Sequence, residues 1–413
     1  MKKAFCLLFS LIMAAGIIAM PVAADQDTIQ VNDDISVSAD YDWTRFKGQG
    51  VKLNVYNWGL YISDGSDESV NVLSAFEQLT GIEVNYTTYD TNESLYAKMK
   101  GGGANYDVIV PSDYMIGKMA KEGMLEKLDY SNIPNYSLIG NAYKGQTYDP
   151  DDEYSVPYTW GVVGLVYNKT MVEEEPDSWA AMWDPRYTGS VLMFNNSRDA
   201  FAIAARKIGV SMNPKTVEDV NRIAEELKAQ KSVVQAYVMD EIFDKMEGGE
   251  AALAPYYAGD AITMMEENPD LGFVIPKEGT NYFVDAMCIP KGSKNKEAAE
   301  MFINFMCEPD VALANCEFIG YSTPIEAVRE MLPEELANSP IAYPSEEVLK
   351  NTETFEALPD EINAAMDTAW SDMKSYDESG GGWVIPVFML LAIALTCFNV
   401  WRRRARKKRK ELY

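Results

Sequence analysis

The 413-residue chain contains no histidine. It therefore cannot form a Ser-His or Cys-His nucleophile system, and no metal site in it can use an imidazole ligand. The glycine cluster GGGAN at 101–105 is not a phosphate loop, because it lacks a preceding strand and a Gly-Lys-Ser/Thr ending. Asp199 and Asp285 could in principle act as a glycosidase pair, but their spacing does not favour catalysis over binding. The sequence predicts a protein that is not an enzyme and uses no cofactor.

Cysteine is scarce as well. The chain has five cysteines, and two of them, Cys6 and Cys397, lie in apolar segments near the two ends. Cys288, Cys307 and Cys316 remain, an odd number without CxxC spacing. Such a set predicts neither a disulfide framework nor a zinc site, so we expect three buried free thiols.

Basic residues are also few. The chain has 36 of them against 63 acidic residues, which gives a net charge of −27. Several of the basic residues are concentrated at the two ends, so the chain between them is even more acidic. An exterior of this kind repels nucleic acid and anionic ligands and attracts cations. Simple solubility is the alternative explanation for the same charge.

An apolar stretch lies near the C-terminus, WVIPVFMLLAIALTCFNVW at 383–401. Its length is that of one membrane helix, Trp383 and Trp401 bracket it, and the basic tail 402–413 follows at once. The sequence predicts a single-pass transmembrane helix with a cytoplasmic tail, joined by a linker at 377–382 to an extracytoplasmic domain. A buried core helix is the alternative.

The N-terminal end is interpreted as a secretory signal over residues 1–24, because two lysines precede an apolar run that ends in small residues. If the signal stays uncleaved, it serves as a second anchor with the same orientation. Residues 25–50 are polar and lack a strong period, so we expect a spacer there.

Strands and helices alternate in the remaining chain. Strands are expected over 51–58, 82–89 and 106–112, with helices over 68–81 and 92–103 between them. This order is typical of a parallel sheet with helices on its faces, whose ligand sites lie beyond the carboxyl ends of the strands. A second unit of strands and helices follows, so we predict a two-lobed α/β fold with a ligand cleft between the lobes.

The expected strand ends carry aromatic, hydroxyl and carboxylate side chains, which suit an elongated organic cation. Asp285 is the most informative of them, because it interrupts the apolar run YFVDAMCIP at 282–290. A buried carboxylate needs a partner, and nothing near it in sequence supplies one. Asp285 could cap a turn or pair with a distant lysine, but its apolar neighbours and the family resemblance described below favour a ligand ammonium group. Asp113 and Asp260 are expected to be solvated loop acids.

Several segments of the chain resemble one known family, the polyamine-binding receptors of ABC importers of the spermidine/putrescine type. The resemblance covers roughly residues 51–376 and rests on YNWGLY, TTYDTNESLYAKM, YDVIVPSDYMI, SVPYTWG, IPKEG, KNKEAAEMFINF and EPDVALANCEFIGYSTP. It implies a periplasmic-binding-protein type II fold and permease subunits of an ABC importer as partners. The implied lobes are 51–160 with 284–329, and 161–283 with 330–376.

The resemblance also implies a set of ligand-binding residues. Tyr257 and Phe283 take the places of two tryptophans, whereas Leu60 and Asn196 stand where the family pattern has carboxylates and Phe355 roughly where it has a glutamine. Fewer carboxylates favour putrescine over spermidine. A receptor for another solute and a sensing ectodomain without a transporter are the alternatives. The implied binding residues are Trp58, Tyr61, Ser112, Tyr114, Asn196, Asp199, Tyr257, Phe283, Asp285 and Tyr321.

Overall fold

The structure is a computed structural model that describes residues 27–102 and 105–376. The predicted signal, linker, membrane span and basic tail lie outside the described residues. Within the described ranges, no helix combines the length and the apolar character needed to cross a membrane.

A first group of strands contains the parallel pairs expected from the sequence. β3 (Lys52–Trp58) lies between β4 (Glu83–Tyr89) and β5 (Val108–Ile109), and it is parallel to both. The connections are α1 (Val72–Thr80) and α2 (Asn92–Lys100). The predicted strand–helix–strand order is therefore present, and it places the carboxyl ends of all three strands at one edge.

Local sequence explains where α1 begins and ends. The Asn71 side chain accepts a hydrogen bond from the Ser74 backbone amide, which satisfies a free donor of the first turn. Gly81 follows the last turn with a backbone φ of 73°, a conformation that residues other than glycine rarely adopt. The chain can therefore turn directly into β4.

Two long antiparallel strands, β6 (Ser155–Asn168) and β11 (Thr280–Cys288), connect the first group of strands to a second. All fourteen residues of β6 are buried, which explains its nearly continuous apolar sequence. Val284 pairs with Trp160, so two of the boundaries between the implied lobes lie side by side in this pair of strands.

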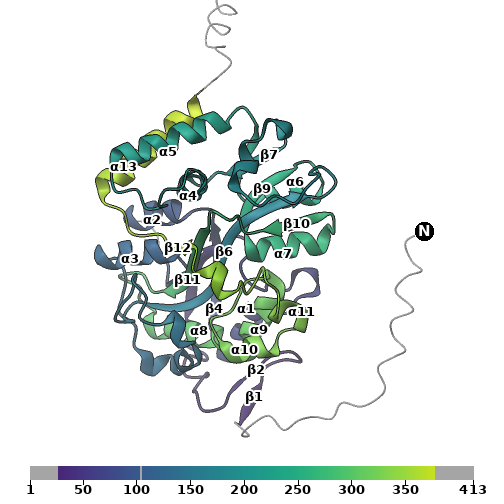
Figure 1. Cartoon of the computed structure of the whole chain (residues 1–413). Coiled ribbons are helices and arrows are strands. Elements are labelled where there is room, and N and C mark those ends of the chain that lie inside the picture. The colour runs from purple at the N-terminus through teal and green to yellow at the C-terminus, as the bar shows by residue number, and fades with distance from the viewer. Residues whose placement is uncertain (1–26, 103–104, 377–413) are drawn as a thin grey trace, which may run out of the picture.

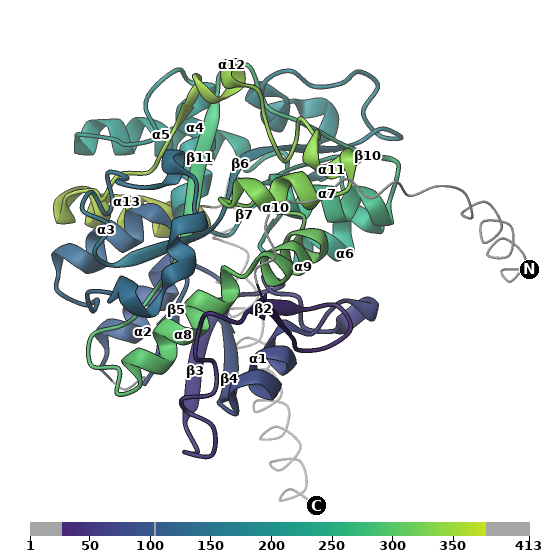
Figure 2. The same ribbon diagram turned by 90° about the horizontal axis from the view of Figure 1, so that it is seen from below.

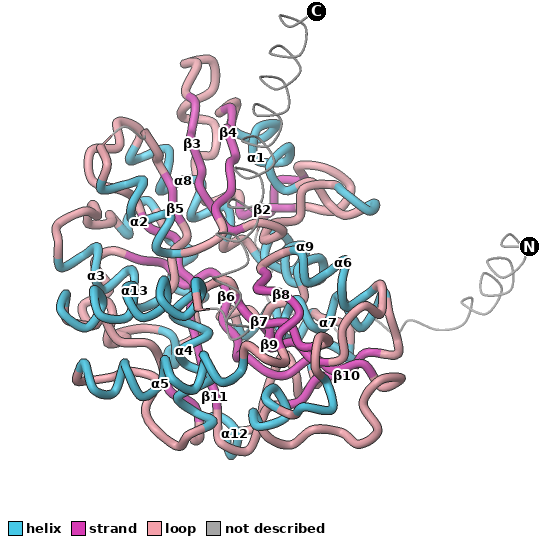
Figure 3. The backbone as a smooth tube through the Cα atoms, turned by 90° about the horizontal axis from the view of Figure 1, so that it is seen from above, coloured by secondary structure: helices cyan, strands magenta, loops and turns pink. Residues whose placement is uncertain are grey.

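The second group consists of β7 (Val191–Phe194), β8 (Val234–Val238), β9 (Leu253–Tyr257) and β10 (Leu271–Val274). β9 and β10 pair with the last residues of β6, and β7 lies between β8 and β9. Figure 3 shows β3 and β4 toward one end of the molecule, β9 and β10 toward the other, and β6 between them.

Helices cover both groups. In the second group α13 (Asp360–Ser375) packs along α5 (Val217–Gln230), as Figure 1 shows. The other helices, with one short strand, are α3 (Asp113–Lys121), α4 (Ser197–Lys207), α6 (Glu241–Glu247), α7 (Ala258–Glu267), α8 (Lys296–Met306), α9 (Pro309–Ile319), α10 (Glu326–Met331), α11 (Glu334–Ala337), α12 (Glu346–Leu349) and β12 (Thr352–Glu353).

The expected spacer at 25–50 is wrong for the described part of this segment. β1 (Thr28–Gln30) and β2 (Ser36–Ser38) form an antiparallel hairpin near α9 (Figure 2). Trp43 is only 1% exposed, and its ring meets the ring of Phe305 edge-on at 6.0 Å. The apolar residues of this segment are too widely spaced to produce a period, so the sequence pattern did not reveal their burial.

The three thiols were predicted correctly. Cys288, Cys307 and Cys316 are free and buried in the structure. Burial raises the pKa of the Cys307 and Cys316 thiols to about 12, so both stay in the unreactive thiol form at neutral pH.

Candidate functional site

A cavity lies where strand ends from both groups meet. Its volume is about 60 Å³, room for about four to six water-sized groups in a row or cluster. All ten residues implied by the family resemblance line it. The remaining lining residues are Gly59, Tyr89, Asp90, Asn92, Met239, Asp240, Tyr256, Asp260, Asn281 and Phe355.

Asp285 lies on β11 at the junction of the two groups and is only 4% exposed. The Tyr61 hydroxyl donates a hydrogen bond of 2.7 Å to Asp285 Oδ2, and it also hydrogen-bonds the Thr159 hydroxyl. Asp285 Oδ1 is buried and has no hydrogen-bond partner among the described residues. Buried carboxylate oxygens are rarely left without a donor, so this oxygen is the natural contact for a ligand N–H.

The surroundings of Asp285 also alter its protonation. Burial raises the pKa of this carboxyl to about 6, and the hydroxyls of Ser112 and Tyr61 act in the opposite direction. Ser112 is brought beside it by a backbone bridge between the end of β5 and β11. A bound cation would favour the charged form further.

Asp199 lies in the first turn of α4, which begins just after β7. The Asn196 side chain caps this helix by accepting a hydrogen bond of 2.9 Å from the Arg198 backbone amide. The Tyr257 hydroxyl donates to Asp199 Oδ2 at 2.8 Å. Burial raises the pKa of Asp199 to about 7, partly offset by that hydroxyl.

Asp260 occupies the corresponding place in α7, just after β9. The Tyr321 hydroxyl donates to its Oδ2 at 2.9 Å, and burial raises its pKa to about 8. Asp260 is half-buried and lies on a helix rather than in a loop, and the expectation of a solvated acid is wrong for Asp113. Asp113 is 2% exposed and its pKa is also raised to about 8 by burial, although it does not line the cavity. Both acids are covered by segments distant in sequence.

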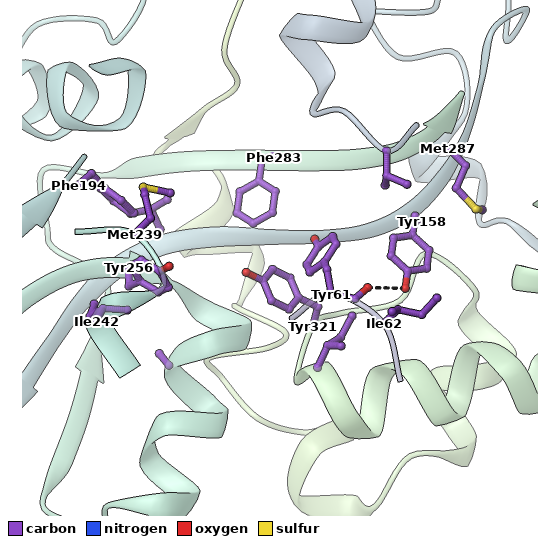
Figure 4. Close-up of a cluster of buried hydrophobic side chains, with 14 of the residues drawn as sticks. Tyr61, Ile62, Tyr158, Phe194, Met239, Ile242, Tyr256, Phe283, Met287 and Tyr321 are labelled. Carbon is purple, nitrogen blue, oxygen red and sulfur yellow. Dashed lines mark hydrogen bonds between the residues drawn. The ribbon is translucent and has the colours of Figure 1, made fainter. Parts of the chain in front are cut away.

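Aromatic rings form the walls between these carboxylates. The Tyr61 and Tyr321 rings meet edge-on, with their centres 4.7 Å apart. The centre of the Phe283 ring lies 6.3 Å from that of Tyr321 (Figure 4). On the first strand group, the Trp58 indole donates to the Val110 carbonyl at 2.9 Å, which holds its ring at the end of β3. Ring faces and edges of this kind accept methylene groups and cations.

Arg198 packs against two of these rings, and it does not line the cavity. Its guanidinium lies 5.1 Å from the centre of the Tyr114 ring and 4.6 Å from that of Phe355. It donates to the Asn213 side chain and to the Glu356 carbonyl. No lysine or arginine of the described residues lines the cavity, although the charge of Arg198 lowers the pKa of Asp199 from outside it.

Leu60 does not line the cavity, although the resemblance aligned it with a family carboxylate. Its side chain is 59% exposed and its φ is 47°, so it points away at a tight turn after β3. Sequence reasoning also missed Asp90 and Asp240. Both follow strand ends, those of β4 and β8, and the strand-end rule applied to these strands would have found them.

Comparison with known proteins gives consistent matches. Residues 71–344 match the family described as "Bacterial extracellular solute-binding protein". The spermidine/putrescine-binding periplasmic protein of Escherichia coli (strain K12) is 38% identical over 304 residues, 73% of this chain and 85% of that one. The putrescine-binding periplasmic protein SpuD of Pseudomonas aeruginosa is 30% identical over 78% of this chain and 92% of its own.

A solved structure agrees with these matches. The spermidine/putrescine ABC transporter substrate-binding protein PotD of Streptococcus pneumoniae is 37% identical, with a TM-score of 0.67 over 79% of this chain and 99% of that one.

Proposed function

This chain belongs to the bacterial extracellular solute-binding proteins, and from that premise we propose that its cavity captures a polyamine and delivers it to an ABC importer. Members of the family bind solutes and are not enzymes. The observation that carries the proposal is Asp285, whose buried Oδ1 has no donor within the described protein. An ammonium group supplies both the missing donor and the missing charge.

The rest of the cavity suits the same ligand class. Asp199 and Asp260 offer two further carboxylates, each oriented by a tyrosine hydroxyl. Aromatic walls separate the three acids, as needed for a chain of methylenes between ammonium groups. The names of the relatives from Escherichia coli and Pseudomonas aeruginosa support the same class.

Which polyamine binds is a separate matter. The expected preference for putrescine rested on missing carboxylates at positions 60 and 196. That count did not include Asp90, Asp240 and Asp260, which all line the cavity. The number of acids therefore no longer favours a diamine.

Calorimetry tests the proposal directly. Putrescine, spermidine and spermine are titrated into the full-length protein at pH 8, with 1,4-butanediol as a neutral ligand of similar length. We expect at least one polyamine to bind and the diol not to bind, because the carboxylates require a cation. Equal binding of diol and diamine, or no polyamine binding, would contradict the proposal.

We also propose that residues 383–401 anchor the protein in the membrane. The support is the apolar sequence, its flanking tryptophans and the basic tail that follows. An anchored receptor stays near the permease, which raises its effective concentration there without any new contact.

A further inference from the structure

Two acids of the cavity lie at its exposed mouth. Asp240 follows β8 of the second strand group, and Asp90 follows β4 of the first. Both side chains line the cavity and both are exposed to solvent. Asp199 and Asp285 differ from this pair because they are buried, with exposed fractions of 5% and 4%. The mouth thus has its own pair of carboxylates, one from each strand group.

Gly59 makes room for one of these carboxylates. A Cβ built at position 59 would lie 2.5 Å from Asp240 Oδ2, closer than real Cβ atoms approach any neighbour. The φ of Gly59 lies outside the positive range in which side chains are strained, so its backbone does not demand glycine. The absence of a side chain at position 59 instead leaves room for the Asp240 carboxylate. Asp240 therefore packs against the backbone that follows β3.

The two mouth acids act on each other. Partial burial raises the pKa of Asp240, and the nearby charges of Asp90 and then Glu241 raise it further, whereas the Tyr256 hydroxyl acts in the opposite direction. The described residues provide no lysine or arginine at the cavity to relieve this repulsion. No hydrogen bond or ion pair within the described ranges uses the Asp90 carboxylate.

The interior of the same cavity supplies independent support for a ligand that can reach this mouth. Asp285 is only 4% exposed, and its Oδ1 has no hydrogen-bond partner among the described residues. An ammonium bound there leaves the rest of an extended ligand to run along the aromatic walls. The mouth also carries carboxylates from both strand groups.

We propose that Asp240, seated against Gly59 and opposed by Asp90, forms an additional ammonium subsite at the cavity mouth. It binds the far end of a polyamine whose other end lies at the enclosed carboxylates. This inference rests on the proposed function and specifies its selectivity: the subsite favours ligands with a third, more distant ammonium group over a short diamine. Because the two acids come from different strand groups, the bound ammonium also ties the groups together.

The experiment measures putrescine and spermidine affinities of full-length wild type, Asp240→Asn and Asp244→Asn by calorimetry at pH 8. Asp244 is a matched control: it lies on α6, close to Asp240 in sequence, and is exposed, but it does not line the cavity. We expect Asp240→Asn to weaken spermidine about tenfold and putrescine less than twofold. Asp244→Asn should change both by less than twofold, as expected for an exposed charge screened by salt.

Gly59→Ala provides a second variant that leaves every charge in place. Its methyl group would displace the Asp240 carboxylate, so it should also weaken spermidine selectively. Combined with Asp240→Asn it should weaken spermidine no further than the stronger single variant, because both changes remove the same contact.

The outcomes separate the two proposals. If wild type binds spermidine but Asp240→Asn behaves like Asp244→Asn, or weakens both ligands equally, the mouth subsite is wrong and the proposed function stands. Additive effects of Gly59→Ala and Asp240→Asn would likewise overturn the subsite. Wild-type protein that binds no polyamine overturns both.

Discussion

Asp285 is only 4% exposed, and one of its carboxylate oxygens accepts a hydrogen bond while the other has no partner among the described residues. Replacing it by asparagine keeps the size of the side chain but removes the charge. We expect Asp285→Asn to fold normally and to lose about 2 to 5 kcal/mol of polyamine binding free energy, because the ligand ammonium is then buried without its counter-charge. Calorimetry measures the affinity, and thermal unfolding reports the fold.

Asp270→Asn is the control for this variant, since Asp270 is an exposed acid away from the cavity. It should leave the affinity unchanged. An Asp285→Asn protein that binds within twofold of wild type would show that the ammonium lies elsewhere.

The enclosed acids should also make binding depend on pH. Burial raises the pKa values of Asp285, Asp199 and Asp260 to about 6, 7 and 8 in the ligand-free protein. A protonated carboxyl cannot pair with an ammonium group, so affinity should increase from pH 5.5 to pH 8.5. Calorimetry at neutral pH in two buffers of different ionisation enthalpy should detect protons released on binding. Affinity that is constant over this range would contradict the prediction.

The same pKa values determine how the ligand-free protein responds to pH. A carboxyl whose pKa is raised on folding favours the folded state only while it is protonated. The contribution of these three acids is complete below about pH 4, the usual range of an aspartate. It is lost as pH rises through 6 to 8. A bound polyamine should offset the loss, because it stabilises the charged forms.

At the residue level, the family resemblance implied ten residues that all line the cavity, whereas the strand-end acids Asp90 and Asp240 were missed. Asp285 was identified because a carboxylate in an apolar run demands a partner. Asp260 was misjudged because the group that encloses it, Tyr321, is 61 positions away. Burial by distant segments leaves no trace in local composition.

At the level of elements, the N-terminal hairpin and the segment after it act as part of the folded body. Trp43 is buried against Phe305, and its indole donates to the Ser38 carbonyl at 2.8 Å. Trp43→Ala should reduce the free energy of unfolding by about 3 to 5 kcal/mol, the usual cost of deleting a large buried ring. Urea denaturation with a fluorescence or circular dichroism readout measures it.

Ile29→Ala is the matched control, because Ile29 is an apolar residue of the same segment that is 38% exposed. It should change stability by about 0.5 kcal/mol or less. If Trp43→Ala were equally silent, residues 27–50 would behave as the spacer that the sequence suggested.

Elements were predictable where local signals were strong. β3, β4, α1 and α2 have clear periods, caps and glycine stops, and their bounds were expected within a few residues. The hairpin at 28–38 was missed because its strands have three residues each. Strands this short owe their position to packing rather than to their own pattern.

For the whole molecule, the pairing of β6 with β11 and the position of the cavity follow from contacts between residues more than 100 positions apart. The sequence predicted two units and a cleft, because strand–helix alternation occurs twice. It could not provide the order of strands within the sheet. The family resemblance implied the type of fold, but no strand order was predicted from it.

The last prediction concerns how the whole chain is held at the cell surface. The described body ends with α13 and Tyr376, and the proposed span begins at Trp383, so the body would lie directly at the membrane. Full-length protein should sediment with membranes, resist high salt and require detergent for release, because about 19 apolar residues bury too much surface to dissociate. Truncation after Ser379 should release the protein with its ligand affinity unchanged, since the residues that line the described cavity fall between Trp58 and Phe355. Truncation after Trp401 is the control: it removes the basic tail but keeps the apolar stretch, so this protein should stay with the membrane fraction. Salt extraction of the full-length protein would mean that residues 383–401 are not a span and that the receptor reaches its permease by diffusion.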